Sequence, residues 1–231
     1  ITIAKERAER GHFYINGDNL PQKALFQLKQ DEIIEYDDIH NGYFITHDIY
    51  EEWALDKIVS TSFSNISTIK NFFNDLGNSL SIRRAFRLWL LNQISENLIQ
   101  ESLISIDINQ NWKDEVLISI LLSDYASTFF SFSKQELIAN NFEILKQILF
   151  LLRVACTNIL ANRNIEIIEP KGKGWEEAIA FIYKNKANFF SDNLKIILPV
   201  LSDWCNFNKI GETTKYAGLL ALSIIEESEA K

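Results

Sequence analysis

From Asp48 to the end of the chain, apolar residues recur with few interruptions at the spacing of an amphipathic helix. The first such stretch repeats them at Ile49, Trp53, Ile58 and Phe63. Glycine and proline, which interrupt helices, number only eight and three in 231 residues. The pattern therefore predicts a mainly α fold. Further helices are expected at 68–77, 82–106, 112–130, 133–164, 174–190, 192–207 and 213–228.

The first sixty residues follow a different pattern. Residues 20–30 are predicted to form a helix. Residues 32–37 and 43–46 are rich in β-forming side chains, and the Asn41-Gly42 pair between them is a strong hairpin signal. A helix followed by a hairpin is the local order of a winged-helix module that ends in its wing. We therefore predict a winged-helix domain over residues 1–63.

The rest of the chain, residues 64–231, is predicted to form stacked helical hairpins of the HEAT-like kind. Segments 117–130 and 195–207 each contain an apolar run, then Leu-Ser-Asp and an aromatic residue. Their offset is twice the HEAT period of roughly 40 residues. The Ser-Lys-Gln-Glu run at 133–136 has the spacing of a capping box and is expected to begin a helix. Stacking would bury the broad apolar faces of these helices, although a closed helical bundle is the alternative.

The charge is acidic and unevenly distributed. The net charge is −8, and residues 31–60 hold nine Asp or Glu against a single Lys. A winged helix that reads DNA needs a basic wing and a basic recognition helix. The predicted wing is acidic, so DNA is not expected to be a partner.

The cysteine and hydropathy patterns indicate the cellular compartment of the protein. Cys156 and Cys205 lie far apart inside apolar helical patterns, without the spacing of a metal site. Two reduced, buried thiols indicate a cytoplasmic protein. The longest apolar stretch is broken by Lys146, Gln147 and Arg153, so no membrane helix is predicted.

The candidate chemistry is concentrated in the His47-Asp48 pair, where the second predicted strand turns into a helix. Asp48 could accept hydrogen bonds from the first turn of that helix as a cap. No strained, Gly-flanked Ser or Cys is present to complete a catalytic group. No second histidine follows at the spacing of a metal site. A helix cap and a nucleotide contact are the two interpretations that stay open.

The run from Gly42 to Ser60, GYFITHDIYEEWALDKIVS, resembles the Met-His-Asp motif of STAND-class NTPases (AP-ATPase and NLR-like proteins), and most closely that of the bacterial antiphage members. Residues 81–94, 171–181 and 213–225 are similar to the helical repeats that follow the winged helix in that family. Thr46 stands where the family often has Met.

The resemblance implies that His47 reaches the β-phosphate of a bound ADP and holds the winged helix against an upstream nucleotide-binding domain. Asp48 would fix the turn. ATP exchange would remove this contact and release the domain.

The sequence has no G-x-x-x-x-G-K-[ST] phosphate loop. This chain alone is therefore expected to be inactive, with no cofactor of its own, whereas the parent protein would be an ATPase that binds ADP or ATP with Mg²⁺. The chain begins at Ile1 and contains no Met, which we interpret as a piece of a longer protein. The glycines and lysines of PKGKG, residues 170–174, could cradle an anion, but a connection between helices is the favoured interpretation.

A candidate interface lies on the predicted helix that begins near residue 82, where Arg83, Arg84 and Arg87 accompany Trp89. The alternative is a solvated face with arginine stems lying over the core. The five tryptophans are predicted to pack between helices.

The resemblance implies that this chain is the regulatory, sensor-proximal region of a STAND NTPase in antiviral defence. Its helical repeats would sense a target protein, such as a phage component, and the parent would form a homo-oligomer on activation. Two alternatives stay open. One is a helical protein-binding scaffold without nucleotide linkage, and the other is a winged-helix transcriptional regulator.

Overall fold

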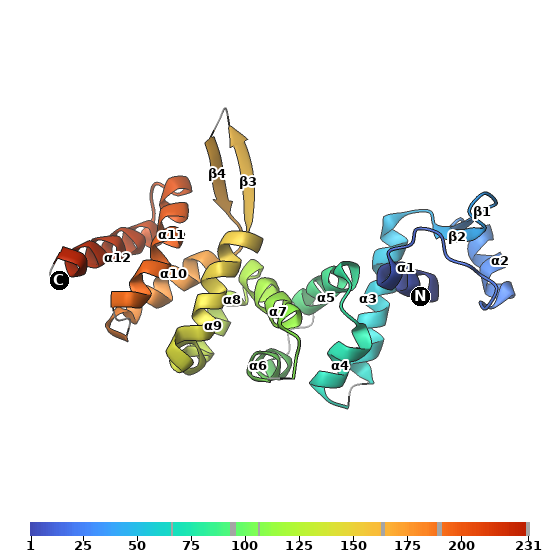
Figure 1. Ribbon diagram of the computed structural model, residues 1–231, viewed down its shortest axis with the longest axis horizontal. Helices are drawn as coiled ribbons and strands as arrows, with labels where there is room; N and C mark the ends of the chain where they lie inside the picture. Colours follow the sequence, from blue (N-terminus) through green and yellow to red (C-terminus); the bar gives the residue numbers. More distant parts are fainter. Residues whose placement is uncertain (66, 93–95, 106, 163–164, 189–190, 230–231) are drawn as a thin grey trace. The chain divides into compact units, whose positions relative to one another are not determined.

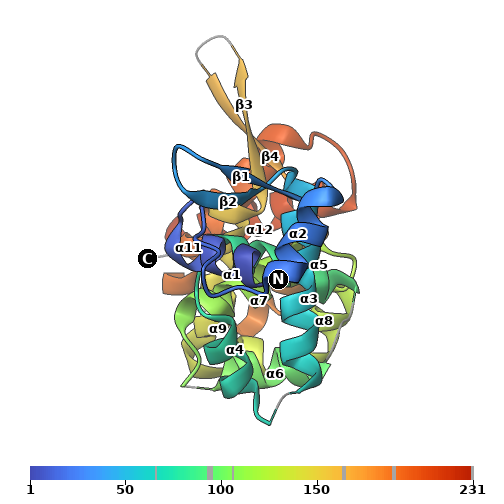
Figure 2. The same cartoon turned by 90° about the vertical axis from the view of Figure 1, so that its right-hand side faces the viewer.

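The computed structural model describes residues 1–65, 67–92, 96–105, 107–162, 165–188 and 191–229. The fold is mainly helical, as predicted, and the chain divides into two compact units, Ile1–Glu115 and Val116–Lys231. Residue 63, the predicted end of the first domain, lies in the last turn of the helix Asp48–Ser64, which packs against elements on both sides of it in the sequence. Figures 1 and 2 show the path of the chain within each unit.

The N-terminal unit is built around one long helix, α3, with α1 and the first hairpin near one end and α4 at the other (Figure 1). α3 packs on α1, α4, α5 and β2. The elements of this unit are α1 (Thr2–Arg10), α2 (Gln22–Gln30), β1 (Ile34–Asp37), β2 (Gly42–Ile45), α3 (Asp48–Ser64), α4 (Ile69–Leu76), α5 (Leu80–Asn92), α6 (Glu96–Ile104) and the start of α7 (Gln110–Leu122).

The predicted hairpin is confirmed. β1 and β2 are antiparallel, with Ile34 opposite Ile45 at one end and Asp37 opposite Gly42 at the other. Asn41 takes a positive φ of 49° just before β2, a conformation that asparagine tolerates better than most residues. Ile15 adds a bridge to the free side of β2 through two backbone hydrogen bonds with Tyr43, of 2.8 and 2.9 Å.

An aromatic cluster forms much of the core of this unit. Phe63 at the end of α3 packs on Trp89 of α5, with 4.8 Å between ring centroids. Trp112 packs on Phe86 and donates its indole N–H to the Gly77 carbonyl at 2.9 Å. The cluster therefore joins α3, α4, α5 and α7. Its members are Phe63, Phe72, Phe73, Phe86, Trp89 and Trp112.

The C-terminal unit consists of helices and a second hairpin. α10 packs on α8 and α12, and α11 packs on α9, α12 and β4. Its elements are α8 (Ala126–Phe132), α9 (Lys134–Ala155), β3 (Thr157–Asn162), β4 (Ile165–Pro170), α10 (Gly174–Lys184), the 3₁₀ turn η1 (Lys186–Asn188), α11 (Ser191–Phe207) and α12 (Glu212–Glu229).

The second hairpin was not predicted. The helix expected to run to about residue 164 ends at Ala155, and β3 pairs with β4 from Thr157 opposite Pro170 onward. The Cys156 carbonyl, at the end of the helix, accepts hydrogen bonds from the Lys171 amide and the Trp175 indole. These tertiary contacts take the chain out of the helix, and the hairpin projects from the helices of its unit (Figure 2).

The predicted capping box does not form. Ser133 makes no side-chain hydrogen bond to the described first turn of α9. α9 is also interrupted, because residues 139–142 leave the helical conformation and Asn140, Asn141 and Phe142 have positive φ. The helix is therefore two segments joined at a kink.

The two Leu-Ser-Asp segments take different local structures. Leu122 ends α7 and Asp124 lies in the turn before α8, whereas Leu201 and Asp203 lie inside α11. The sequence similarity therefore does not mark equivalent positions of a repeated unit.

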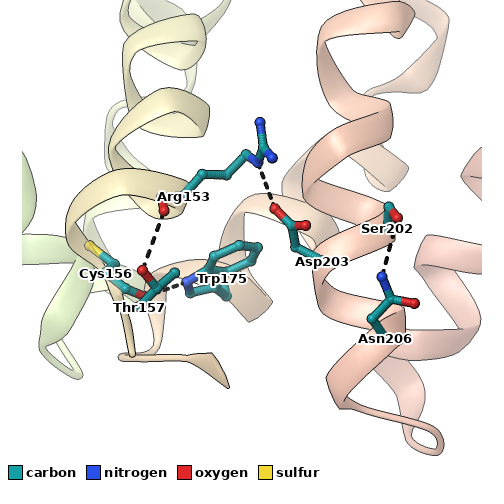
Figure 3. A network of polar contacts seen from close by, with 7 residues as sticks. All are labelled: Arg153, Cys156, Thr157, Trp175, Ser202, Asp203 and Asn206. Carbon is teal, nitrogen blue, oxygen red and sulfur yellow. Dashed lines mark hydrogen bonds and ion pairs between the residues drawn. The ribbon is translucent and has the colours of Figure 1, made fainter. Parts of the chain in front are cut away.

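Polar contacts tie α9 to the neighbouring helices of its unit, as Figure 3 shows. The Arg153 guanidinium pairs with Asp203 of α11 at 2.6 Å. The Trp175 indole donates to the Cys156 carbonyl at 2.8 Å. Together these contacts fix the end of α9 against α10 and α11.

Truncation of Trp89 tests the importance of the aromatic cluster. Trp89 is only 2% exposed, so Trp89→Ala should lower the free energy of unfolding by about 3–5 kcal/mol in urea denaturation. The matched control is Trp53→Ala, which removes a side chain that is 63% exposed and should cost less than about 1 kcal/mol. Equal costs for the two variants would contradict the assigned core.

Candidate functional site

His47 occupies the junction between the hairpin and α3. It is the N-cap residue of α3, in an extended conformation with φ −135° and ψ 137°, and it is exposed. Its imidazole makes no capping hydrogen bond to the described residues of α3. Asp48 already lies in the first helical turn, where its negative charge interacts favourably with the positive end of the helix dipole. The predicted strand-to-helix junction is therefore present, and the histidine ring faces solvent.

Thr46 fixes this junction from the strand side. Its hydroxyl donates to the Glu32 carbonyl at 2.6 Å and lies 3.2 Å from the Ile33 carbonyl. Its amide also donates to the Ile33 carbonyl at 3.2 Å. The residue that departs from the family motif thus anchors the end of β2 to the segment before β1.

A row of rings runs from His47 along α3. The His47 and Tyr50 rings meet edge to face at 5.8 Å, and Tyr50 meets Trp53 in the same way at 5.8 Å. The spacing of three residues places successive members on neighbouring turns of the helix. The row connects the exposed histidine to a groove on the same helix.

His40, near the tip of the first hairpin, serves a different purpose. Its ring lies 3.0 Å from Asp37 and stacks on Tyr14 at 4.2 Å. The His40 backbone N–H donates to the Asp37 carboxylate, and this hydrogen bond is the main cause of the lowered pKa of Asp37. His40 is therefore part of the turn structure.

The groove lies between the first halves of α3 and α5 and has a volume of about 480 Å³. We call it the α3 groove, and Asp48–Asp56 and Leu80–Leu88 contain its lining residues. Leu55 of the lining is buried, but the other large apolar lining residues remain open to solvent. The exposed fractions are 46% for Ile49, 63% for Trp53, 75% for Leu80 and 51% for Leu88.

Carboxylates dominate the polar lining of the α3 groove. Its acidic members are Asp48, Glu51, Glu52 and Asp56, all from α3, and its single basic member is Arg84 from α5. Glu51 is mostly buried and pairs with Arg7 at 3.3 Å. Burial raises the pKa of Glu51, and the neighbouring Asp48 and Glu52 raise it further while Arg7 lowers it. The groove is therefore acidic and partly apolar.

The four predicted interface residues separate in the structure. Arg84 lines the α3 groove and is exposed. Arg87 pairs with the largely buried Glu115 at 2.6 Å. Arg83 has its Nε buried without a hydrogen-bond partner among the described residues. Trp89 belongs to the aromatic cluster, so it is not available as an exposed contact. Of this set, Arg84 alone joins Asp48 in one site.

The five tryptophans differ in their exposure to solvent. Trp89, Trp112, Trp175 and Trp204 are buried as expected, but Trp53 is exposed in the groove. Its position between Glu52 and Asp56, one turn after Tyr50, was the available signal of a solvent-facing aromatic residue.

The PKGKG segment is a structural connection between β4 and α10. Lys171 pairs with Glu169 at 3.1 Å, and Lys173 contacts Glu176. Gly172 has a φ of 80°, and a Cβ there would lie 2.4 Å from the Leu121 carbonyl oxygen. The glycine therefore allows close packing on α7, and both lysines are already paired with carboxylates.

No group of three or more His, Cys, Asp or Glu in the described ranges could hold a metal ion. Cys156 is buried and Cys205 is half-buried, and burial raises the pKa of the Cys205 thiol. Within the part of the chain that the structure describes, no single helix has the length and apolar composition needed to cross a membrane. No protein-family model matches the chain, and no match is found among the curated proteins.

Substitution of Glu51 tests the electrostatics of the groove. Because its pKa is raised in the folded state above 4.5, the folded protein holds this proton more tightly than the unfolded chain. The unfolding free energy should therefore fall as pH rises from about 4.5 through the folded pKa. Glu51→Gln should remove this loss, so urea denaturation at pH 4 to 7 should show wild type weakening relative to the variant. Glu35→Gln, at an exposed position of β1, controls for the loss of one charge. A wild type that becomes more stable relative to Glu51→Gln as the pH rises would contradict the assigned burial of Glu51.

Substitution of Gly172 tests the structural role of PKGKG. Gly172→Ala should cost about 2–4 kcal/mol of stability, since it combines an unfavourable φ with a clash against α7. Gly218→Ala is the control, because no described atom lies within 4 Å of the added Cβ, and it should be neutral or stabilising by up to about 1 kcal/mol. Stability is measured by thermal denaturation. If Gly172→Ala is as stable as wild type, the structural role of the segment is contradicted and an anion site becomes the better interpretation.

Proposed function

We propose that this chain is the regulatory region of a STAND-class NTPase, in which the N-terminal unit holds an ADP-bound resting state through His47. The observation that carries the proposal is the exposed imidazole of His47 at the junction of β2 and α3, where the hydrogen bonds of Thr46 hold the backbone of the junction. An exposed imidazole can donate a hydrogen bond to a phosphate oxygen supplied by another domain.

The order of elements supports a winged-helix assignment for the N-terminal unit. α1, the Ile15 bridge, α2 and the β1–β2 hairpin follow one another as helix, short strand, helix and wing. The module would act as a clamp between domains rather than as a DNA reader, since the net charge of −8 repels a phosphate backbone.

The charges around His47 favour a diphosphate over a triphosphate. Asp48, Glu51 and Glu52 follow His47 on α3, so a nucleotide with an additional phosphate would be repelled more strongly. A hydrogen bond to the β-phosphate would stabilise the ADP state, and exchange for ATP would weaken the clamp. A coupling of about 1–3 kcal/mol is typical for such switches.

Hydrolysis is proposed to belong to an upstream nucleotide-binding domain of the parent protein, with its own phosphate loop and Mg²⁺. The C-terminal unit would be a HEAT-like stack that senses a target protein, such as a phage component. Its packed helices α10, α11 and α12 and the projecting β3–β4 hairpin offer surfaces for that purpose. The parent would act in the cytoplasm in antiviral defence and assemble into a homo-oligomer when activated.

The nucleotide retained by the parent protein tests this proposal. The protein would be expressed from its full reading frame, purified and denatured, and the released nucleotide quantified by chromatography. Wild type should carry close to one ADP per chain, and His47→Ala should lose most of it. His12→Ala, which removes an exposed histidine away from the junction, should retain it. A wild type without nucleotide, or equal ADP in all three proteins, would overturn the proposal.

A further inference from the structure

We propose that the α3 groove binds a protein segment that presents Lys or Arg side chains beside a large apolar side chain. This inference goes beyond the proposed nucleotide clamp and does not depend on it, because it rests on side chains of α3 and α5 other than His47. It assigns a partner chemistry to the groove that lies beside the proposed nucleotide contact on α3.

The apolar content of the groove indicates an occupant with an apolar anchor. Trp53 and Leu80 are among the most exposed large apolar side chains of the N-terminal unit, at 63% and 75%. They line one groove together with Ile49 and Leu88. Apolar surface gathered in a concavity with a polar rim is the usual mark of a binding site, whereas single exposed apolar residues are ordinary. A volume of about 480 Å³ falls in the range of ligand-binding pockets.

The charge of the groove selects a basic occupant. Four carboxylates face one guanidinium, and the Arg7 pair offsets the charge of Glu51 alone. The remaining three, on Asp48, Glu52 and Asp56, are exposed. This imbalance would attract Lys or Arg and repel phosphate or an acidic segment. Arg84, on the opposite wall, can donate hydrogen bonds to a carboxylate or backbone carbonyl of the partner and so fix its direction.

Trp53 can contact both the apolar anchor and the basic side chain of the partner. Its exposed ring offers apolar area, and its face can also receive a cation from the partner. Tryptophan is among the residues that most often dominate the binding energy of an interface. Trp53 should therefore be the largest single contributor, with the flanking carboxylates Glu52 and Asp56 setting the preference for basic residues.

The dimensions of the groove limit the length of the occupant. The lining runs from Asp48 to Asp56 on α3 and from Leu80 to Leu88 on α5. Eight residues along a helix correspond to roughly 12 Å. That length accommodates about two turns of a partner helix or about four residues of an extended strand. A short linear segment is therefore sufficient to fill it.

The test uses the 231-residue chain and two fluorescein-labelled peptides of about 14 residues, which is longer than the groove and near the lower limit for a helix in water. One peptide contains Leu and Lys in an amphipathic pattern, and the other has Glu in place of every Lys. Binding is measured by fluorescence anisotropy at about 0.15 M ionic strength, where diffuse surface attraction is screened. The Lys peptide should bind and the Glu peptide should not.

Four variants locate the site. Trp53→Ala and Glu52→Lys should each weaken binding of the Lys peptide by at least about tenfold. Phe26→Ala removes an aromatic side chain of matching exposure, 64%, from α2, and Glu35→Lys reverses an exposed charge on β1. Both controls should change affinity by less than about twofold. All four substitutions are at exposed positions. Circular dichroism is to be used to check that each variant is folded.

Failure of the Lys peptide to bind wild type would overturn the proposal. Equal weakening by Glu52→Lys and Glu35→Lys would also overturn it, because the attraction would then be a property of the whole acidic surface. Loss of ADP in His47→Ala bears only on the nucleotide clamp, so the two proposals fail separately.

Discussion

The contact between Phe63 and Trp89 is the constraint on which the N-terminal unit depends. It joins the last turns of α3 to α5, with 4.8 Å between ring centroids, and Phe72 and Phe86 pack around the same indole. A long helix held firmly at one end has its other end placed by the same packing, since protein cores are close-packed and rigid. The positions of His47 and of the α3 groove therefore follow from an aromatic core near the far end of the helix.

Two surfaces with different chemistry thus share one helix. The ring of His47 lies at its N-terminus, and the row through Tyr50 leads to Trp53 in the groove. Because both surfaces are carried by the same rigid element, an occupant of the groove and a nucleotide at His47 would each influence the position of α3. Such coupling is energetic and reciprocal. It would let a regulatory unit respond to a protein segment and to a phosphate group through a single helix.

Local signals in the sequence were sufficient for the first hairpin and for most helices, whose patterns are determined by nearby residues. α4 is an example, since Thr68 accepts a hydrogen bond from its first turn and Gly77 ends it with a positive φ. The β3–β4 hairpin was missed because Cys156, which ends α9, is held by Trp175, nineteen residues later. The groove could not be predicted either, since it requires the distance between α3 and α5. Trp53 is exposed and Trp89 is buried, and the carboxylates that flank Trp53 are the local difference between the two.

The central claim, that His47 stabilises an ADP-bound state, is tested most directly by nucleotide affinities. Isothermal titration calorimetry on the parent protein, stripped of nucleotide, gives the affinities for ADP and ATP in wild type and in His47→Ala. Wild type should prefer ADP, and the substitution should weaken ADP by about tenfold, the equivalent of one hydrogen bond to a charged group, while changing ATP much less. Equal effects on both nucleotides, or none on either, would contradict a contact that distinguishes the two states.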